Sequence, residues 1–162
     1  MIYTTRYTSP LGPLTLGSDG KSLTGLWLEG QKHFPDIGSH IAATDLPVFA
    51  VAEQWLKDYF CGLRPDPKVL PLSPAGSAFQ RSVWALLAEI PYGETVTYGE
   101  LGMRLGSSAR AVGGAVGRNP LSIILPCHRV LGTGSKLTGY AGGIDKKIWL
   151  LRHEGAAFQL PE

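Results

Sequence analysis

The chain is organised around one stretch, which reads Asn119-Pro120-Leu121-Ser122-Ile123-Ile124-Leu125-Pro126-Cys127-His128-Arg129. Within it, the apolar run 123–125 ends at Pro126, and Cys127 and His128 follow side by side. A short run rich in β-branched residues predicts a buried strand or a core spacer. Pro126 ends any ladder pairing and fixes the next turn. We therefore expect a thiol on a rigid support, close enough to the surface to be reached.

Two interpretations of Cys127 follow from its neighbours. Cysteine chemistry needs the thiolate, and an imidazole or a guanidinium nearby lowers the pKa of a thiol. His128 and Arg129 are candidates for that effect by proximity in the sequence. The alternative is a buried structural cysteine, because free cysteine is among the most buried residue types. The adjacency alone favours this alternative, so the decision depends on the rest of the chain.

Length and composition limit the possible classes of protein. The chain has 162 residues, 44% hydrophobic residues and a formal charge of +2, which is typical of one generous domain or two small ones in a soluble protein. No apolar run reaches the length of a membrane span, and the N-terminus lacks the apolar core of a signal peptide. Two cysteines are too few for a disulfide framework and suit a reducing cytosol. We expect a cytoplasmic protein without membrane association.

Charge is unevenly distributed along the chain. Residues 1–76 carry six Lys and Arg against seven Asp and Glu, whereas residues 77–162 carry nine against six. A modestly basic C-terminal part could face nucleic acid. It could equally be an ordinary solvated surface, and charge alone leaves both open.

The N-terminal part has the pattern of a small α/β domain. Alternation and turn residues predict three strands, over residues 2–8, 13–18 and 22–28, in an antiparallel meander. Residues 30–45 are expected to form a loop. A helical period then runs from Leu46 to Phe60, with Asp45 as its expected N-cap and Gly62 after its end. The segment 64–76 holds four prolines and marks the expected boundary between residues 1–76 and 77–162.

The C-terminal part is expected to be mainly helical. A helix begins after the capping-box residue Ser77, and another, with Trp149 in its core, covers 144–153. Between them, short helices over 100–105 and 109–117 are joined by a tight turn at Gly106. Two short helices with such a turn indicate a helix-turn-helix.

The second helix of this pair, residues 109–117, is nearly all small residues with one long cation, Arg110. Each interior glycine costs about 1 kcal/mol relative to alanine. Gly113 and Gly114 therefore need a reason, which is either tight helix packing, the commoner one, or close approach of the backbone to a ligand. Arg110 lies near the positive end of the helix, where it could meet phosphate or enter a stack. The helix has almost no base-reading side chains, so we expect it to read shape and to tolerate different sequences.

Four motifs together resemble the O6-alkylguanine-DNA alkyltransferases over roughly residues 77–155. They are Asn119-Pro120, Pro126-Cys127-His128-Arg129-Val130, Tyr140-Ala141-Gly142-Gly143 and Trp149-Leu150-Leu151-Arg152-His153-Glu154-Gly155. The resemblance implies a ribonuclease H-like α/β layout, followed by a winged-helix-like domain. It also implies a DNA repair protein that flips an O6-alkylated guanine out of the duplex. The alkyl group then passes irreversibly to a cysteine, once per molecule and without a cofactor.

The resemblance assigns catalytic roles by position. Cys127 is similar to the alkyl acceptor, His128 to the base that takes the thiol proton through a water, and Glu154 to the residue that orients His128. Asn119 is similar to the hinge that ties the recognition helix to the active-site segment. Tyr98 is similar to the residue that donates to guanine N3 and crowds the target phosphate. The roles of Cys127, His128 and Glu154 follow a triad logic also found in hydrolases.

The resemblance also implies a surface and a pocket. Arg110 is similar to the finger that fills the gap left by the flipped base, and the helix would enter the minor groove of double-stranded DNA. The surface would comprise Ser108, Ala109, Arg110, Gly113, Gly114 and Tyr98. The pocket would comprise Val130, Tyr140, Ala141, Gly142, Lys147 and Ser122, with the Val130 and Cys127 carbonyls accepting from the guanine amino group.

The chain departs from the family pattern in four places. The turn between the two short helices is about two residues shorter and lacks a proline, which affects the reach of Arg110. Ala141 stands where some members have serine, so a bond to guanine O6 must come from the backbone. Ser122 replaces a proline, which affects the tolerance of bulky alkyl groups. The zinc ligands of some members are missing, so we expect no metal, and we expect a monomer.

Three other functions remain to be weighed. A non-catalytic module that binds alkylated DNA would lack the acceptor cysteine, whereas Cys127 is intact. A helix-turn-helix transcription factor would need base-reading side chains. A cysteine hydrolase would need direct contact between Cys127 and His128, which point to opposite faces if that segment is extended.

Overall fold

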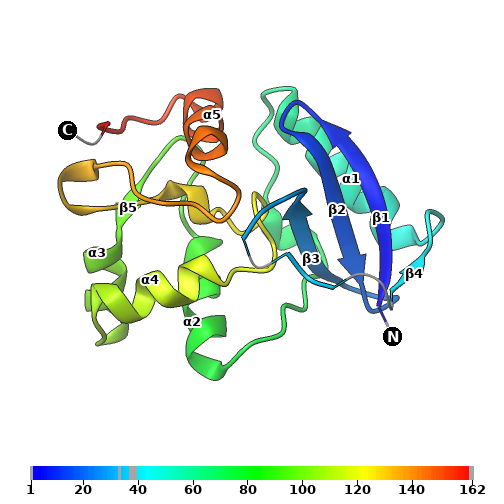
Figure 1. The fold of residues 1–162 in the computed structure, drawn as a ribbon, viewed down its shortest axis with the longest axis horizontal. Coiled ribbons are helices and arrows are strands. Elements are labelled where there is room, and N and C mark those ends of the chain that lie inside the picture. Colours follow the sequence, from blue (N-terminus) through cyan, green and yellow to red (C-terminus); the bar gives the residue numbers. More distant parts are fainter. Residues whose placement is uncertain (1, 33, 37–39, 161–162) are drawn as a thin grey trace. The chain divides into compact units, whose positions relative to one another are not determined.

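The computed structural model describes residues 2–32, 34–36 and 40–160 (Figure 1). The chain forms two compact units. The first comprises Met1–Ala75 together with Pro120–Ser122, and the second comprises Gly76–Asn119 and Ile123–Glu162. None of the helices in the described residues is long and apolar enough to cross a membrane.

A four-stranded sheet forms the core of the first unit. β1 (Tyr3–Ser9), β2 (Gly12–Ser18) and β3 (Leu23–Leu28) are antiparallel neighbours, which confirms the predicted meander. A short fourth strand, β4 (Ile41–Ala42), pairs in parallel with β1, so the order is β3-β2-β1-β4. It lies in the segment that we expected to be a loop, because two residues are too few to produce a visible alternation.

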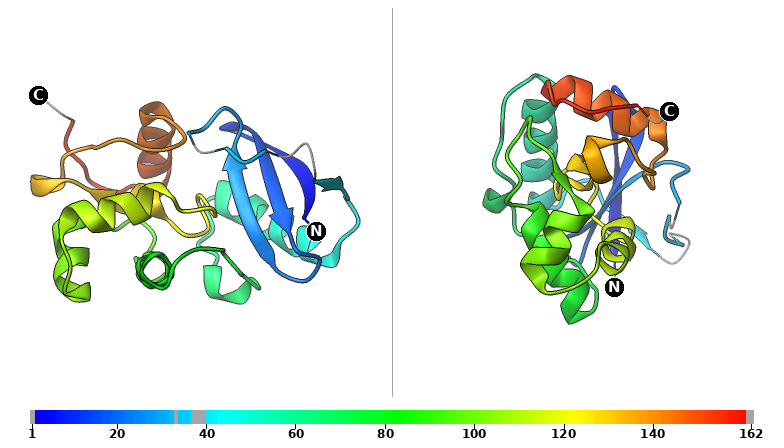
Figure 2. Two further views of the ribbon diagram at one scale, coloured as in Figure 1. Left: turned by 60° about the horizontal axis from the view of Figure 1, so that its bottom comes forward. Right: turned by 90° about the vertical axis from the view of Figure 1, so that its left-hand side faces the viewer.

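Helix α1 (Pro47–Phe60) packs across one face of this sheet (Figures 1 and 2). Its apolar stripe, which includes the fully buried Phe49 and Leu56, provides the contact. The predicted cap at Asp45 is wrong, because the N-cap is Leu46 and it makes no side-chain cap bond. Proline at the first helical position forces the residue before it into an extended conformation, and that residue then becomes the cap.

Two segments from other parts of the chain extend the β3 side of the sheet. The Leu23 N–H donates to the Pro71 carbonyl at 2.7 Å. Farther along, the Leu26 N–H donates to the Pro120 carbonyl at 2.8 Å, and the Ser122 N–H donates to the Leu26 carbonyl at 3.1 Å. The first of these segments lies in the proline-containing stretch 64–76, which the sequence indicated as a linker, although it pairs with β3.

The second unit is mainly helical. Its helices are α2 (Ala78–Leu87), α3 (Tyr98–Leu105), α4 (Ala109–Gly117) and α5 (Ile144–Glu154), and β5 (Val96–Thr97) pairs in parallel with β6 (Val130–Leu131). The predicted capping box at Ser77 is confirmed, since its side chain accepts from the Gln80 N–H while the Gln80 side chain bonds back. The Trp84 indole donates to the Ala115 carbonyl at 2.8 Å and so ties α2 to α4.

The helix-turn-helix is formed by α3 and α4, which meet at a corner (Figure 2). Thr97 caps α3, so this helix begins at Tyr98, earlier than the predicted residue 100. Gly106 ends it with φ +62°, and the Ser108 side chain caps α4. The turn is so tight that a Cβ on Gly102 would lie 3.0 Å from the Ser107 carbonyl oxygen.

The stretch around Cys127 is a bend and not a strand. Ile123 has φ +72°, and Cys127–Arg129 form a single turn of 3-10 helix. The apolar run 123–125 is buried, so it acts as the core spacer, and the strand alternative is wrong. The Asn119 side-chain amide donates to the Leu125 carbonyl at 2.8 Å and spans this bend.

Candidate active site

Cys127 lies in the interior of the second unit. It is only 5% exposed, so the thiol is buried, as the structural alternative for Cys127 also expects, and this exposure does not test whether a substrate can reach it. Burial raises the pKa of the Cys127 thiol, while hydrogen bonds from Asn119 and Tyr140 and the charge of Lys147 act in the opposite direction. The neighbours in sequence, His128 and Arg129, are not the groups that act on the thiol pKa. A 3-10 turn directs successive side chains apart, so the adjacent residues do not meet the sulfur.

His128 and Glu154 form a buried pair. The distance from His128 Nε2 to Glu154 Oε2 is 2.7 Å, and neither side chain is exposed. Burial lowers the pKa of His128, although the neighbouring carboxylate opposes this effect, so the ring is neutral at pH 7. Its other nitrogen, Nδ1, is buried and has no hydrogen-bond partner among the described residues. With the Nε2 proton donated to Glu154, the lone pair of Nδ1 is available to accept a proton.

Arg129 is a member of this site that the sequence analysis did not assign. Its Nε donates to Glu154 Oε1 at 2.7 Å and its Nη2 to Oε2 at 3.0 Å, in a bidentate ion pair. Burial alone would raise the pKa of Glu154, but the hydrogen bonds and charges of His128 and Arg129 hold it well below its usual range. The guanidinium also lies over the Tyr92 ring, 5.7 Å from its centre. The position of Arg129 directly after His128 was the feature of the sequence that could have indicated it as an ion-pair partner of Glu154.

A second buried cation, Lys147, interacts electrostatically with Cys127. Its Nζ donates to the Val130 carbonyl at 2.8 Å, to Thr138 Oγ1 at 3.1 Å and to the Gly139 carbonyl at 3.4 Å. The Tyr98 hydroxyl in turn lies 3.2 Å from Thr138 Oγ1. Burial lowers the pKa of Lys147 to about 8 and raises that of Tyr98. Thr138 is the member of this chain of bonds that sequence reasoning missed.

A hollow of about 400 Å³ lies in the second unit beside α3 and the start of α4. Its lining residues are Tyr98, Gly99, Ala109, Arg110, Gly113, Gly132, Thr133 and Thr138. Four of the six residues predicted to face DNA therefore line this hollow, namely Tyr98, Ala109, Arg110 and Gly113. Of the other two, Ser108 caps α4, and Gly114 is exposed, with no atom within 4 Å of a Cβ placed on it. Close helix packing therefore does not explain Gly114.

The remaining predicted pocket residues are less closely grouped. Ala141 and Gly142 are half-buried in a turn that is closed by a bond from the Gly143 N–H to the Tyr140 carbonyl, directly before α5. Ser122 belongs to the first unit, where its backbone pairs with β3.

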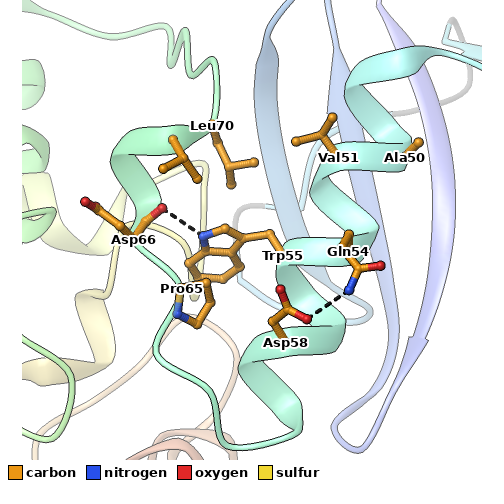
Figure 3. Close-up of a pocket in the computed structure, with 9 residues that line it drawn as sticks. Ala50, Val51, Gln54, Trp55, Asp58, Pro65, Asp66 and Leu70 are labelled. Atoms are coloured by element: carbon orange, nitrogen blue, oxygen red, sulfur yellow. Dashed lines mark hydrogen bonds between the residues drawn. The ribbon is translucent and has the colours of Figure 1, made fainter.

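The first unit has a pocket of its own, of about 590 Å³, between α1 and the 3-10 turn Pro67–Val69 (Figure 3). Its walls are mostly apolar, with Trp55 at the centre. Two carboxylates on its rim are already used, because Asp58 accepts from Gln54 and Asp66 accepts from the Lys68 N–H. Its lining includes no cysteine or histidine, so it lacks the chemistry found around Cys127.

The second unit combines a helix-turn-helix, which is a common DNA-binding motif, with a buried cysteine that is followed in the chain by an ordered imidazole, and these two features suit a DNA-binding group-transfer protein. Comparison with known families agrees with this class. Residues 78–156 match the DNA binding domain of 6-O-methylguanine DNA methyltransferase, and residues 2–74 match the ribonuclease-like domain of the same proteins. The chain belongs to the 6-O-methylguanine DNA methyltransferase family.

Individual relatives cover nearly the whole chain. The methylated-DNA–protein-cysteine methyltransferase of Haemophilus influenzae is 45% identical over 155 residues, which are 94% of this chain and 86% of the relative. That of Methanosarcina acetivorans is 43% identical over 96% of this chain and 99% of the relative. The Mycobacterium tuberculosis OGT structure in complex with DNA has a TM-score of 0.85 at 43% identity, over 94% of this chain and 92% of that one. These matches confirm the resemblance and the fold class that the sequence predicted.

Proposed function

We propose that this protein repairs DNA by transferring the alkyl group of an O6-alkylated guanine to Cys127, once per molecule. Relatives at 45% and 43% identity are methylated-DNA–protein-cysteine methyltransferases, and the acceptor cysteine of the family motif is intact here. The observation that carries the proposal is the buried His128–Glu154 pair. His128 follows Cys127 in the chain, and its Nδ1 has no hydrogen-bond partner among the described residues. A module that only binds alkylated DNA would not need the intact acceptor cysteine, Cys127.

Deprotonation of Cys127 is the first step. Burial keeps the thiol protonated at neutral pH, so the protein needs a base. His128 Nδ1 would accept the proton through one water, since no direct bond joins the ring to the sulfur. Glu154 would hold the ring with Nδ1 as the acceptor and stabilise the imidazolium that forms. The nearby Lys147 ammonium would stabilise the thiolate.

Attack then follows an in-line path. The Cys127 sulfur forms a bond to the alkyl carbon while the bond from that carbon to guanine O6 breaks. The electron pair of the broken bond moves into the purine, which then needs a proton or a strong donor. The Tyr98 hydroxyl, whose residue lines the hollow beside α4, would donate to guanine N3. The resulting thioether is stable, and this reaction draws on neither a metal nor a cofactor.

The number of alkyl groups that each protein molecule accepts provides the test. We expect an intact-protein mass spectrum, taken after mixing with a duplex that carries one O6-methylguanine, to show a gain of one CH₂ that saturates at one per protein. Cys127→Ala should show no gain. Cys61→Ala is the matched control, because Cys61 is an exposed free thiol, and it should gain mass as the wild type does. A gain that mapped to Cys61, or no gain at all, would contradict the proposal.

We further propose that α4 enters the minor groove of double-stranded DNA, with Arg110 taking the place of the flipped base. Support comes from the small exposed residues of α4 and from the position of Arg110 beside the hollow. Flipping costs a few kcal/mol, and an inserted cation that stacks and bonds offsets part of that cost. A minor-groove ligand should compete with the protein for duplex DNA, whereas a major-groove ligand should not. We propose a monomer in solution, which sedimentation velocity tests.

A further inference from the structure

Thr138 occupies a central position between two groups that the mechanism uses. Its Oγ1 lies 3.1 Å from the Lys147 Nζ and 3.2 Å from the Tyr98 hydroxyl. All three residues belong to the second unit. Thr138 also lines the hollow beside α4, together with Tyr98. The Thr138 hydroxyl therefore connects the buried Lys147 ammonium to the Tyr98 phenol at the edge of the hollow.

The chemistry of the three groups fixes the direction of the bond from Lys147, and the bond between Tyr98 and Thr138 can run in either direction. An ammonium can only donate, so Thr138 Oγ1 accepts from Lys147. The hydroxyl hydrogen of Thr138 is then available for the Tyr98 oxygen, and a bond in that direction favours the phenolate, in agreement with the lowering effect of Thr138 on the pKa of Tyr98. With its oxygen satisfied in this way, Tyr98 can direct its own hydrogen into the hollow.

The Thr138 rotamer is held by packing. A Cβ placed on Gly132 would lie 2.9 Å from the Thr138 methyl group, Cγ2, so the methyl sits against the bare glycine backbone. This contact places the methyl on one side and leaves the hydroxyl toward Tyr98 and Lys147. The absence of a side chain at residue 132 is therefore a condition for the chain of bonds.

We propose that Thr138 is a positioning residue that links Lys147 to Tyr98 in a proton relay to the departing purine. The inference rests on the proposed alkyl transfer. As the sulfur–carbon bond forms and the bond to O6 breaks, guanine N3 takes the Tyr98 proton. Tyr98 takes the proton of Thr138, and Thr138 takes one from Lys147, which is left as a neutral amine. The thiol proton is by then on His128, so protons and charge balance.

The acidities of the two ends favour this direction. Burial raises the pKa of Tyr98 above its ordinary value of about 10. Burial lowers the pKa of Lys147 to about 8, although the charge of Cys127 opposes this. A proton therefore moves downhill from the ammonium to a phenolate. Loss of the positive charge of Lys147 would follow the loss of the negative charge on the sulfur, which has then become a neutral thioether.

The test compares variants at one residue on two substrates. Thr138→Val keeps the shape and removes the hydroxyl, whereas Thr138→Ser keeps the hydroxyl. The single-turnover rate constant of methyl transfer is measured with saturating protein on duplex O6-methylguanine and on O6-methyl-3-deazaguanine, which lacks the N3 acceptor. General acid catalysis contributes about 10²–10⁴-fold, so we expect Thr138→Val to slow transfer from O6-methylguanine by about tenfold or more, and Thr138→Ser by less than about threefold.

On the 3-deaza substrate, the wild type and Thr138→Val should react at equal rates, because the relay has no acceptor there. A structural role alone would slow the variant equally on both substrates and would overturn the inference, as would a Thr138→Val variant as fast as the wild type. Gly132→Ala is a second route, since its methyl group would displace the Thr138 side chain, and it should show the same dependence on substrate. If the wild type itself transfers no methyl group, the proposed function fails, which is a separate outcome.

Discussion

At the scale of single residues, the most strongly held group is the Glu154 carboxylate. It accepts from His128, from two nitrogens of Arg129 and, at 3.3 Å, from the Gly93 N–H. Burying a charge is tolerable only when such partners replace water. Arg129 therefore neutralises the charge of the Glu154 carboxylate. Its own charge also lowers the pKa of His128 and so opposes the raising effect of Glu154.

Removal of Arg129 should strongly destabilise the protein. Arg129→Met leaves the Glu154 carboxylate buried without its counter-charge, which costs about 3–5 kcal/mol in free energy of unfolding. The matched control is Arg104→Met, because Arg104 pairs with Glu89 at 3.5 Å with both side chains exposed. An exposed pair contributes less than about 1 kcal/mol. Urea unfolding followed by tryptophan fluorescence measures both, and equal losses would contradict the buried ion pair.

Acid should reduce stability in two steps. Burial lowers the pKa of His128, so its contribution is present above the unfolded value of about 6.5 and is lost as pH falls through the folded pKa. The lowered pKa of Glu154 gives a contribution that is present above about 4.3 and is lost at lower pH. Denaturant unfolding at a series of pH values should show a decline from about pH 6.5 downward. In His128→Asn the first part of the decline should be shallower, and a wild-type stability that rose on acidification would refute the assignment.

Sequence reasoning found some of these residues and missed others for a physical reason. The motif resemblance brought His128 and Glu154 together, and the structure places them 2.7 Å apart. Arg129 was noticed, but its partner was sought next to it in sequence, whereas a long side chain can reach a carboxylate on α5. Thr138 carried no signal, because a threonine between two partners is recognisable only when the fold has placed both.

At the scale of elements, α4 combines three glycines with an exposed face. Gly114 lies in the helix interior with open space around it, so alanine there should stabilise the fold by about 1 kcal/mol. The added methyl group would stand where the proposed DNA surface needs close approach, so Gly114→Ala should bind duplex DNA more weakly by fluorescence anisotropy. A variant that gained stability and bound as tightly as the wild type would show that Gly114 does not serve DNA binding.

Gly102 on α3 should behave in the opposite way. Its Cβ would meet the backbone of the turn, which cannot move aside as a flexible side chain could. Gly102→Ala should therefore lose about 1–3 kcal/mol through overpacking. Thermal unfolding compares it directly with Gly114→Ala, and a neutral result would mean that the turn can relax. The sequence indicated both helices and the Gly106 turn, but it could not distinguish a glycine needed for packing from one that is not.

At the scale of the whole molecule, the chain passes from the first unit to the second at residues 75–76 and returns for Pro120–Ser122. The four prolines of 64–76 indicated the first passage between the units, at residues 75–76. Nothing in the sequence indicated that Pro120–Ser122 return to the first unit, because their pairing with β3 uses backbone groups, which every residue has. Leu121, which is fully buried in this segment, joins the packing of the sheet unit through its bridge to Leu26.

Truncation of Leu121 should therefore destabilise the sheet unit, although the residue lies far along the chain. Leu121→Ala should lower the free energy of unfolding by about 2–5 kcal/mol, through lost burial and the cavity left behind. Leu63→Ala is the control, because Leu63 is 58% exposed, and it should change stability by less than about 0.5 kcal/mol. Hydrogen exchange of β3 amides should quicken in the first variant only. Unchanged exchange there would contradict the role of the segment.

The return of Pro120–Ser122 to the sheet also limits how the gene can be rearranged. A protein whose units met at a single junction could exchange one of them by recombination at that point, with the other left intact. Here a new N-terminal unit would have to accept, along its β3, three residues encoded in the middle of the other unit. Exchange of the N-terminal unit alone would therefore succeed only with a replacement whose edge strand can pair with these three residues.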